Sequence, residues 1–171
     1  MKLIKPNAKY KQSYISLIEA FKDQNEDLIP FPLMEDYTDF QAMIERLNGY
    51  ENGIGLRPDF VRHATYWLID DMENVVAVSN LRLELTDALR YFGGHIGYGV
   101  KPSERRKGYA TFMLKETLKR ASSFGLKEVL LTINVNNIGS NKTVLNNAGV
   151  LDSTEFISQR KLQINRYWIQ T

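Results

Sequence analysis

Cysteine is absent from the 171-residue sequence, and so is any apolar run long enough to cross a membrane. Without cysteine the chain has no disulfide, no thiolate metal site and no cysteine nucleophile. A membrane-spanning helix needs about 18 or more consecutive apolar residues. The first residues, MKLIKPNAKYKQ, contain no apolar stretch typical of a signal peptide. We therefore expect a cytoplasmic protein with no bound metal and no membrane partner.

Two common phosphate-binding patterns are also missing. The chain contains neither GxxxxGK[ST] nor GxGxxG, which argues against a mononucleotide P-loop and a dinucleotide-binding turn. Its formal net charge of +2 is too small to suggest a nucleic-acid partner, because such binding needs a broad basic face. The composition, 43% hydrophobic and 25% charged, is that of a globular protein, and we expect one domain over residues 1–171.

Hydrophobic periodicity predicts an α+β protein with one mixed sheet and helices on its faces. The predicted strands lie at residues 2–6, 64–70, 75–85, 95–100, 127–134, 150–158 and 164–170, and the predicted helices at 8–21, 38–47, 109–122 and 136–149. Thr38 and Gln41 resemble a capping box at the start of the second helix. Residues 86–94 are expected to be a longer connection. Gly97 and Gly99 predict a bulge or a close approach of a ligand to the fourth strand.

The stretch VKPSERRKGYA, residues 100–110, places several cations where a helix begins. It contains one acid, Glu104, and four basic residues: Lys101, Arg105, Arg106 and Lys107. A helix N-terminus carries partial positive charge and prefers acidic side chains, so this arrangement predicts that an anion binds there. Gly108 allows close approach of a ligand, and successive free amides converge on phosphate oxygens. The alternative is a solvated basic turn with no ligand.

These residues resemble a known family. VKPSERRKGYA after a strand is similar to the acetyl-coenzyme A pyrophosphate loop of the GNAT superfamily of N-acetyltransferases, and GGHIGYGVKPSERRKGYA resembles a bacterial branch of predicted acetyltransferases. Asn137 to Ser140 resembles the family's Asn-x-x-Ser/Ala segment beside the pantetheine arm. The resemblance covers roughly the whole chain. It implies the acyl-CoA N-acyltransferase (GNAT) fold, with a mostly antiparallel sheet of about seven strands flanked by helices and splayed between strands 4 and 5.

The resemblance also implies acetyl-CoA as cosubstrate. Amides of the loop would hold its pyrophosphate, the edge of the fourth strand would bind pantetheine, and the Val100 N–H would act as an oxyanion donor. The cofactor-binding residues so implied are Gly99, Val100, Arg105, Arg106, Lys107, Gly108, Tyr109, Ala110, Asn137 and Ser140.

The expected chemistry is direct attack of an amine on the acetyl thioester, which requires a base because most amines are protonated at pH 7. The candidates are His95, Tyr98 and Glu84. His95 titrates in the right range, but a half-exposed strand histidine bonded to the backbone fits equally well, and Glu84 fits a solvent-facing carboxylate. Strand alternation places His95 and Tyr98 on opposite faces.

The usual general acid of the family is missing, because many members have a Tyr seven residues after the position of Asn137 and this sequence has Val144. Ser140, Tyr167 or water are the substitutes that remain.

The sequence thus favours an N-acetyltransferase acting on a primary amine of a small molecule, an amino acid or a peptide. Glu35, Asp36 and Asp39 would attract a cationic amine. Val144 keeps open the alternative of a catalytically degenerate acyl-CoA-binding regulatory domain. A nucleic-acid-binding domain would need more clustered cations than this loop supplies. The acceptor, the acyl-chain preference and a homodimer are left open.

Overall fold

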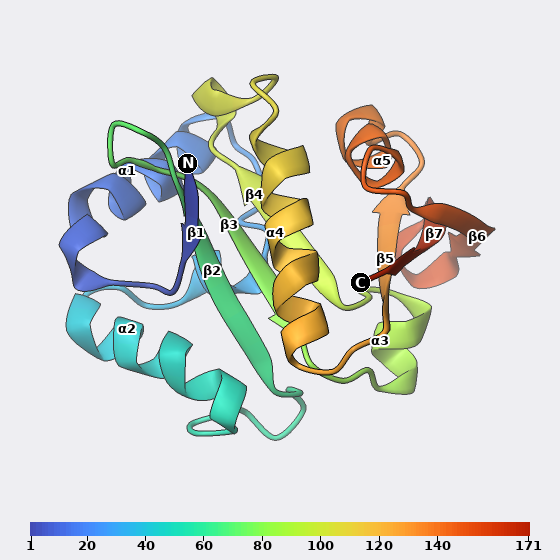
Figure 1. Ribbon diagram of the computed structural model, residues 1–171, viewed down its shortest axis with the longest axis horizontal. Helices are drawn as coiled ribbons and strands as arrows, with labels where there is room; N and C mark the ends of the chain where they lie inside the picture. Colours follow the sequence, from blue (N-terminus) through green and yellow to red (C-terminus); the bar gives the residue numbers. More distant parts are fainter.

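The computed structural model describes all residues, 1–171, as two antiparallel sheets with helices packed on them (Figure 1). The first sheet has the strand order β1-β2-β3-β4 and the second β5-β7-β6. The strands are β1 (Lys2–Ile4), β2 (His63–Ile69), β3 (Val75–Arg82), β4 (Ile96–Val100), β5 (Glu128–Asn134), β6 (Val150–Ile157) and β7 (Leu162–Gln170). The helices are α1 (Lys11–Asp23), α2 (Phe40–Gly49), α3 (Asp87–Tyr91), α4 (Tyr109–Ser123) and α5 (Ile138–Leu145). The α+β class and the seven-strand, helix-flanked architecture are those expected from the sequence.

The first sheet is buried on both faces. Side chains of alternate strand residues point to opposite faces, so Trp67 and Val78 pack with α1 and α2 while Leu68 and Leu81 pack with α4. Tyr14 of α1 stacks on Trp67 with ring centroids 4.4 Å apart. None of the helices has the length and apolar character that a membrane-spanning helix requires.

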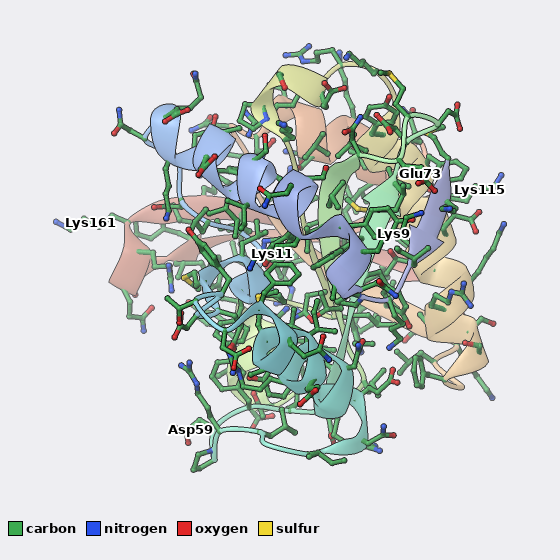
Figure 2. The ribbon with its side chains drawn as sticks, turned by 90° about the vertical axis from the view of Figure 1, so that its left-hand side faces the viewer. Lys9, Lys11, Asp59, Glu73, Lys115 and Lys161 are labelled. Carbon is green, nitrogen blue, oxygen red and sulfur yellow. The ribbon has the colours of Figure 1, made fainter.

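Charged side chains lie on the outer surface of the first sheet and its helices. Figure 2 shows Lys9 and Glu73 facing each other between the start of the first helical segment and the β2–β3 turn, with Lys9 Nζ 2.7 Å from Glu73 Oε2. The Lys9 ammonium lowers the pKa of the Glu73 carboxyl. Both side chains are more than half exposed, so the pair adds little to stability.

Several local predictions were wrong for identifiable reasons. β3 ends at Arg82, so Leu83 and Leu85 lie beyond the strand. Helix α2 is capped by Asp39, whose Oδ1 accepts from Ala42 N, and not by Thr38. The expected connection over residues 86–94 contains a helix that was not predicted, the short α3, which Thr86 caps through its side chain. The Thr-Asp pair at its start was a usable N-cap signal. The strands divide into two sheets because β4 and β5 diverge, at the position where the resemblance implied a splay.

β4 and β5 meet at one end only. His95 N donates to Leu130 O at 2.7 Å, and Leu130 N donates to His95 Nδ1 at 2.8 Å. Gly93 N donates to Thr132 Oγ1 at 2.9 Å. We call this contact, made by Arg82, Gly93, Gly94, His95, Leu130 and Thr132, the sheet joint. In Figure 1 the two strands lie closest near α3 and are farther apart toward α5.

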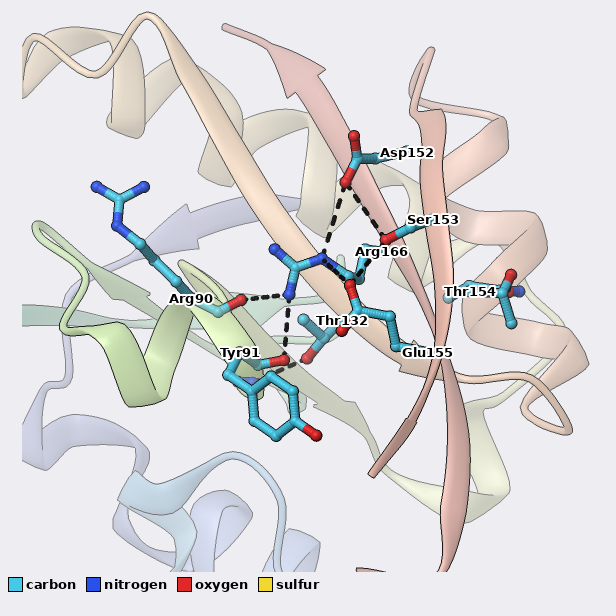
Figure 3. Close-up of polar contacts among 10 residues, drawn as sticks. Arg90, Tyr91, Thr132, Asp152, Ser153, Thr154, Glu155 and Arg166 are labelled. Atoms are coloured by element: carbon cyan, nitrogen blue, oxygen red, sulfur yellow. Dashed lines mark hydrogen bonds and ion pairs between the residues drawn. The ribbon is translucent and has the colours of Figure 1, made fainter. Parts of the chain in front are cut away.

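Arg166 of β7 fastens α3 beside the joint (Figure 3). Its Nη1 donates to the carbonyl oxygens of Arg90 and Tyr91, at 2.5 and 3.2 Å. Its Nε lies 3.4 Å from Glu155 Oε1 and 3.8 Å from Asp152 Oδ2, both on β6. The last carbonyls of a helix favour a nearby cation. Arg166 therefore links α3, which connects β3 and β4 of the first sheet, to the second sheet.

Candidate functional site

A groove of about 860 Å³ lies between β4 and α5, on the side where β4 and β5 diverge. Its floor is Tyr98, Gly99 and Val100 of β4, and its mouth is the segment 104–111. The end of α1 and the following loop form one wall, and residues 136–146 form the other. The volume is within the range of about 300 to 1,000 Å³ that is usual for small-molecule sites.

The mouth of the groove exposes a run of unpaired backbone donors. The amides of residues 106–111 have no hydrogen-bond acceptor in the protein, and Phe112 N is the first to bond, to Gly108 O at 3.1 Å. Gly108 begins α4 at φ +82° and supplies no side-chain cap, and Arg106 has φ +65°. A Cβ on Gly108 would meet nothing within 4 Å, so the space beside these amides is open. Unpaired amides at a helix start bind anions.

The cations near the mouth are mostly engaged with protein groups. Arg105 pairs with Glu26, with Nη1–Oε1 and Nη2–Oε2 distances of 2.7 and 2.5 Å, and Lys107 Nζ lies 2.7 Å from Glu104 Oε2. Lys101 Nζ donates to Ser16 Oγ at 2.9 Å. Arg106 has no ion-pair partner. The positive potential at the mouth therefore comes mainly from the amides and the helix end, with Arg106 as the free cation.

The edge of β4 presents main-chain groups to the groove. Lys101 N donates to Val76 O of β3, and successive strand amides point in opposite directions, so the Val100 and Tyr98 N–H groups face the groove. By the same alternation the polar groups of Gly99 face β3. The β3–β4 pairing is regular and has no bulge. A Cβ on Gly99 would collide with the Ile29 carbonyl oxygen, so this glycine accommodates a protein segment and not a ligand.

The opposite wall is fixed by an asparagine network. Asn137 Oδ1 accepts from Ser140 N at 3.0 Å and caps α5, as its position predicted. Asn141 Nδ2 donates to Asn137 O at 2.8 Å, and its Oδ1 accepts from the Tyr167 hydroxyl at 2.8 Å. Tyr167 is thus engaged behind α5 and does not line the groove. Val144 is fully buried in the core.

Tyr98 and Ser140 are brought together across the groove. The Tyr98 hydroxyl donates to the Ser140 carbonyl oxygen at 3.5 Å, which is a long hydrogen bond. Burial raises the pKa of the Tyr98 phenol, so it is protonated near pH 7. A phenol from β4 therefore lies against α5, on the helix where the resembled family places its Tyr.

The structure places His95 and Glu84 outside the groove. His95 Nδ1 is occupied by the Leu130 N–H, and burial lowers the pKa of His95 to about 4. Glu84 follows the end of β3, is half exposed, and lies 3.4 Å from Arg62 Nε. Glu84 matches the solvent-facing alternative considered for it, whereas His95 bonds to the backbone as its alternative required but is buried and lies just before β4.

The acidic residues expected to attract an amine have internal partners. Glu35 is buried and accepts from the Tyr50 hydroxyl at 3.0 Å and from Arg46 Nε at 3.3 Å. Asp36 accepts from Thr38 N, and Asp39 caps α2. No group of three or more His, Asp or Glu side chains is arranged to hold a metal ion.

Sequence reasoning missed the wall formed by Phe21, Glu26, Asp27 and Ile29. These residues are more than 70 positions before the mouth, and no local pattern sets them apart. The glycine at position 99 was the one usable signal, because it indicated a close approach to β4 without identifying the segment that approaches.

Comparison with known proteins identifies the family. The family model described as acetyltransferase (GNAT) family matches residues 16–144, and the chain belongs to this family. A search of curated proteins gives no match.

The fold is shared with solved acetyltransferase structures. The microcin C7 self-immunity acetyltransferase MccE, in complex with acetyl-CoA and AMP, has a TM-score of 0.69 at 17% identity, over 99% of this chain and 91% of that one. The dodecameric spermidine N-acetyltransferase from Vibrio cholerae has a TM-score of 0.63 at 15% identity, over 99% and 92%. A chimera of the Vibrio cholerae enzyme SpeG with hSSAT has a TM-score of 0.65 at 13% identity, over 99% and 96%. At these identities the likeness concerns the fold.

Proposed function

We propose that this protein is an acetyl-CoA-dependent N-acetyltransferase that acts on a primary amine of a small molecule, an amino acid or a peptide. The observation that carries the proposal is the run of unpaired amides over residues 106–111 at the mouth of the groove. Membership of the GNAT acetyltransferase family supports acetyl transfer, and a solved relative of the same fold holds acetyl-CoA.

The residues present fit this cosubstrate. The amides of residues 106–111 would hold the pyrophosphate, and Arg106 would add charge there. The groove-facing edge of β4, with the Tyr98 N–H, would bind the pantetheine arm as an added strand, between β4 and the α5 wall that carries Asn137 and Ser140.

The cosubstrate would supply an activated acetyl thioester, and the protein's groups would stabilise and protonate. As the amine nitrogen bonds to the acetyl carbon, the Val100 N–H would donate to the developing oxyanion, an interaction worth about 3 kcal/mol. When the carbon–sulfur bond breaks, the Tyr98 hydroxyl would donate its proton to the departing thiolate. Asp27 lines the same groove without a hydrogen-bond partner for its carboxylate. It would attract the ammonium form of the amine and take the proton that the amine loses, directly or through water.

A second function, acyl-CoA binding without turnover, is favoured by one observation. The position at which the resembled family has a Tyr holds Val144, which is buried in the core. Cofactor binding alone does not separate the two functions, and thiol release does.

The first test is isothermal titration of acetyl-CoA into the wild type and Gly108→Glu, with ATP as a control ligand. A negative side chain at the mouth should weaken acetyl-CoA binding by at least about 100-fold, through repulsion and blocked approach to the amides. Gly125→Glu is the matched control. Gly125, just beyond the other end of α4, has φ +83° and likewise nothing within 4 Å of an added Cβ.

Loss of binding in Gly108→Glu alone would establish the site, and a panel of primary amines would then be screened for coenzyme A thiol release. Release would support the transferase, whereas binding without release by any amine would support the regulatory domain. A folded wild type that does not bind acetyl-CoA would exclude both functions.

A further inference from the structure

The Arg105 side chain, at the mouth of the groove, is bonded to protein groups. Its guanidinium forms a two-point ion pair with Glu26, and its Nε donates to Val100 O at 3.2 Å. The same guanidinium lies over the Phe21 ring, 5.6 Å from the centroid. Arg105 thus contacts the end of α1, the following loop and β4 together.

These contacts fix one wall of the groove. Glu26 and Asp27 follow directly on α1, and Ile29 packs its carbonyl against Gly99 on the floor. In the segment after α1, residues 24–29, Arg105–Glu26 is the only ion pair. The segment is otherwise held by turn hydrogen bonds to the carbonyl oxygens of Phe21 and Lys22. The Glu26 pKa is lowered by its hydrogen bonds from Arg105, so the pair is charged at neutral pH.

We propose that Arg105 is a positioning residue that holds the wall of residues 24–29 against β4 and does not bind the phosphates of the cosubstrate. The proposal rests on the proposed function, because it assigns a role to a wall of the acetyl-CoA groove. It departs from the expectation that Arg105 serves the pyrophosphate. A guanidinium paired at two points and bonded to Val100 O has few donors left for another anion. The Asp27 carboxylate lies on the same wall, so Arg105 would set where the amine is received.

The changes in acetyl-CoA affinity caused by two substitutions distinguish a positioning residue from a phosphate ligand. If Arg105 positions the wall, Arg105→Gln and Glu26→Gln break the same pair, and each should change the acetyl-CoA Kd by less than about threefold. If Arg105 is a phosphate ligand restrained by Glu26, Arg105→Gln should weaken binding more than about 30-fold and Glu26→Gln should tighten it. The second pattern would overturn the proposal.

Hydrogen exchange of the protein without ligand tests the wall itself. The amides of residues 24, 25, 26 and 29 are hydrogen-bonded, and both variants should exchange them about fivefold faster than the wild type, with the β2 amides unchanged. The double variant should match Arg105→Gln, because Glu26 has no ion pair left to lose once the Arg105 guanidinium is absent. Lys107→Gln breaks the neighbouring pair with Glu104 and should leave these amides unchanged.

Unchanged exchange in Arg105→Gln, with normal acetyl-CoA binding by the wild type, would overturn this proposal alone. Absence of acetyl-CoA binding by the wild type would overturn the proposed function, and the assignment of this wall to a cofactor groove with it. The two failures are therefore distinguishable.

Discussion

The two ends of the space between β4 and β5 use glycine for opposite purposes. At the sheet joint, Gly94 has φ +63°, and an added Cβ would collide with the backbone of Leu130. At the groove mouth, Gly108 has φ +82°, and an added Cβ would meet nothing within 4 Å. Gly94 is needed because the protein's own backbone fills the adjacent space. Gly108 has no neighbour to clash with, so the open space beside it is available to a ligand.

The polar groups of the two ends differ in the same way. At the joint, Arg82 Nη1 donates to the Gly93 and Gly94 carbonyl oxygens at 3.2 and 2.9 Å, and His95 and Leu130 exchange two hydrogen bonds. At the mouth, the amides of residues 106–111 have no acceptor in the protein. Because the polar groups are paired at the joint, β4 and β5 are firmly held together there. Because the amides are unpaired at the mouth, that end can bind a ligand.

The largest effect is expected for Gly94→Ala. The methyl group would force Leu130 away from His95 and add left-handed backbone strain, which together should cost about 3 to 5 kcal/mol in the free energy of unfolding, measured in urea. Gly125→Ala, which carries the strain without the collision, is the control. A loss below about 1.5 kcal/mol would show that the joint yields easily, and the contrast between the two ends would weaken.

A second prediction concerns His95 and pH. Its folded pKa of about 4 lies below the ordinary histidine pKa of about 6.5, so the unfolded chain binds the proton more readily. Stability should therefore fall as pH drops from about 6.5 toward 4, by about 3 kcal/mol from this residue. His95→Asn keeps an acceptor for Leu130 N and cannot titrate. Its deficit relative to the wild type should shrink by that amount between pH 7 and pH 4 in urea unfolding curves.

His63 provides an internal control for this experiment. It is the other histidine of the chain, and burial also lowers its pKa. It is present in both proteins, so its contribution cancels in the difference. Parallel pH curves for the wild type and His95→Asn would mean that His95 becomes protonated without disturbing the joint.

Residue patterns were sufficient to predict the loop and most of the elements. Gly108, the cations around it and the helix that follows are contiguous, and the Asn137 cap is a local signal at a helix start. Each prediction depended on neighbours within about one helical turn, where chain geometry dominates.

The partners of the side chains could not be predicted in this way. Arg105 pairs with Glu26, 79 residues away, and His95 bonds to Leu130, 35 residues away. A histidine or arginine in a loop is equally compatible with a ligand and with a protein partner, and only tertiary packing decides between them. For this reason two of the three base candidates, His95 and Glu84, lie outside the groove, and the groove wall was missed.

A third prediction tests the support of the joint by Arg166. Arg166→Met should cost about 1 to 2 kcal/mol, because two carbonyls of α3 lose their donor and the carboxylates of Asp152 and Glu155 lose their cation. Arg160→Met is the control, since Arg160 is exposed and lies over the Phe92 ring, 4.7 Å from its centroid. Equal urea midpoints for the two variants would show that α3 is held by other contacts.

The smallest change in stability is expected for Gly108→Ala. This variant tests whether the open space beside Gly108 is used by the ligand. Gly108 and Gly125 have φ values of +82° and +83°, and both are free of neighbours within 4 Å. Alanine at either position should cost about 1 kcal/mol, because left-handed backbone strain is the common penalty. Acetyl-CoA affinity, measured by titration calorimetry, should fall only for Gly108→Ala, by about tenfold, because only its methyl group enters the space beside the unpaired amides. Equal affinities for the two alanine variants would mean that the ligand does not approach the mouth at Gly108, and the open space there would need another explanation.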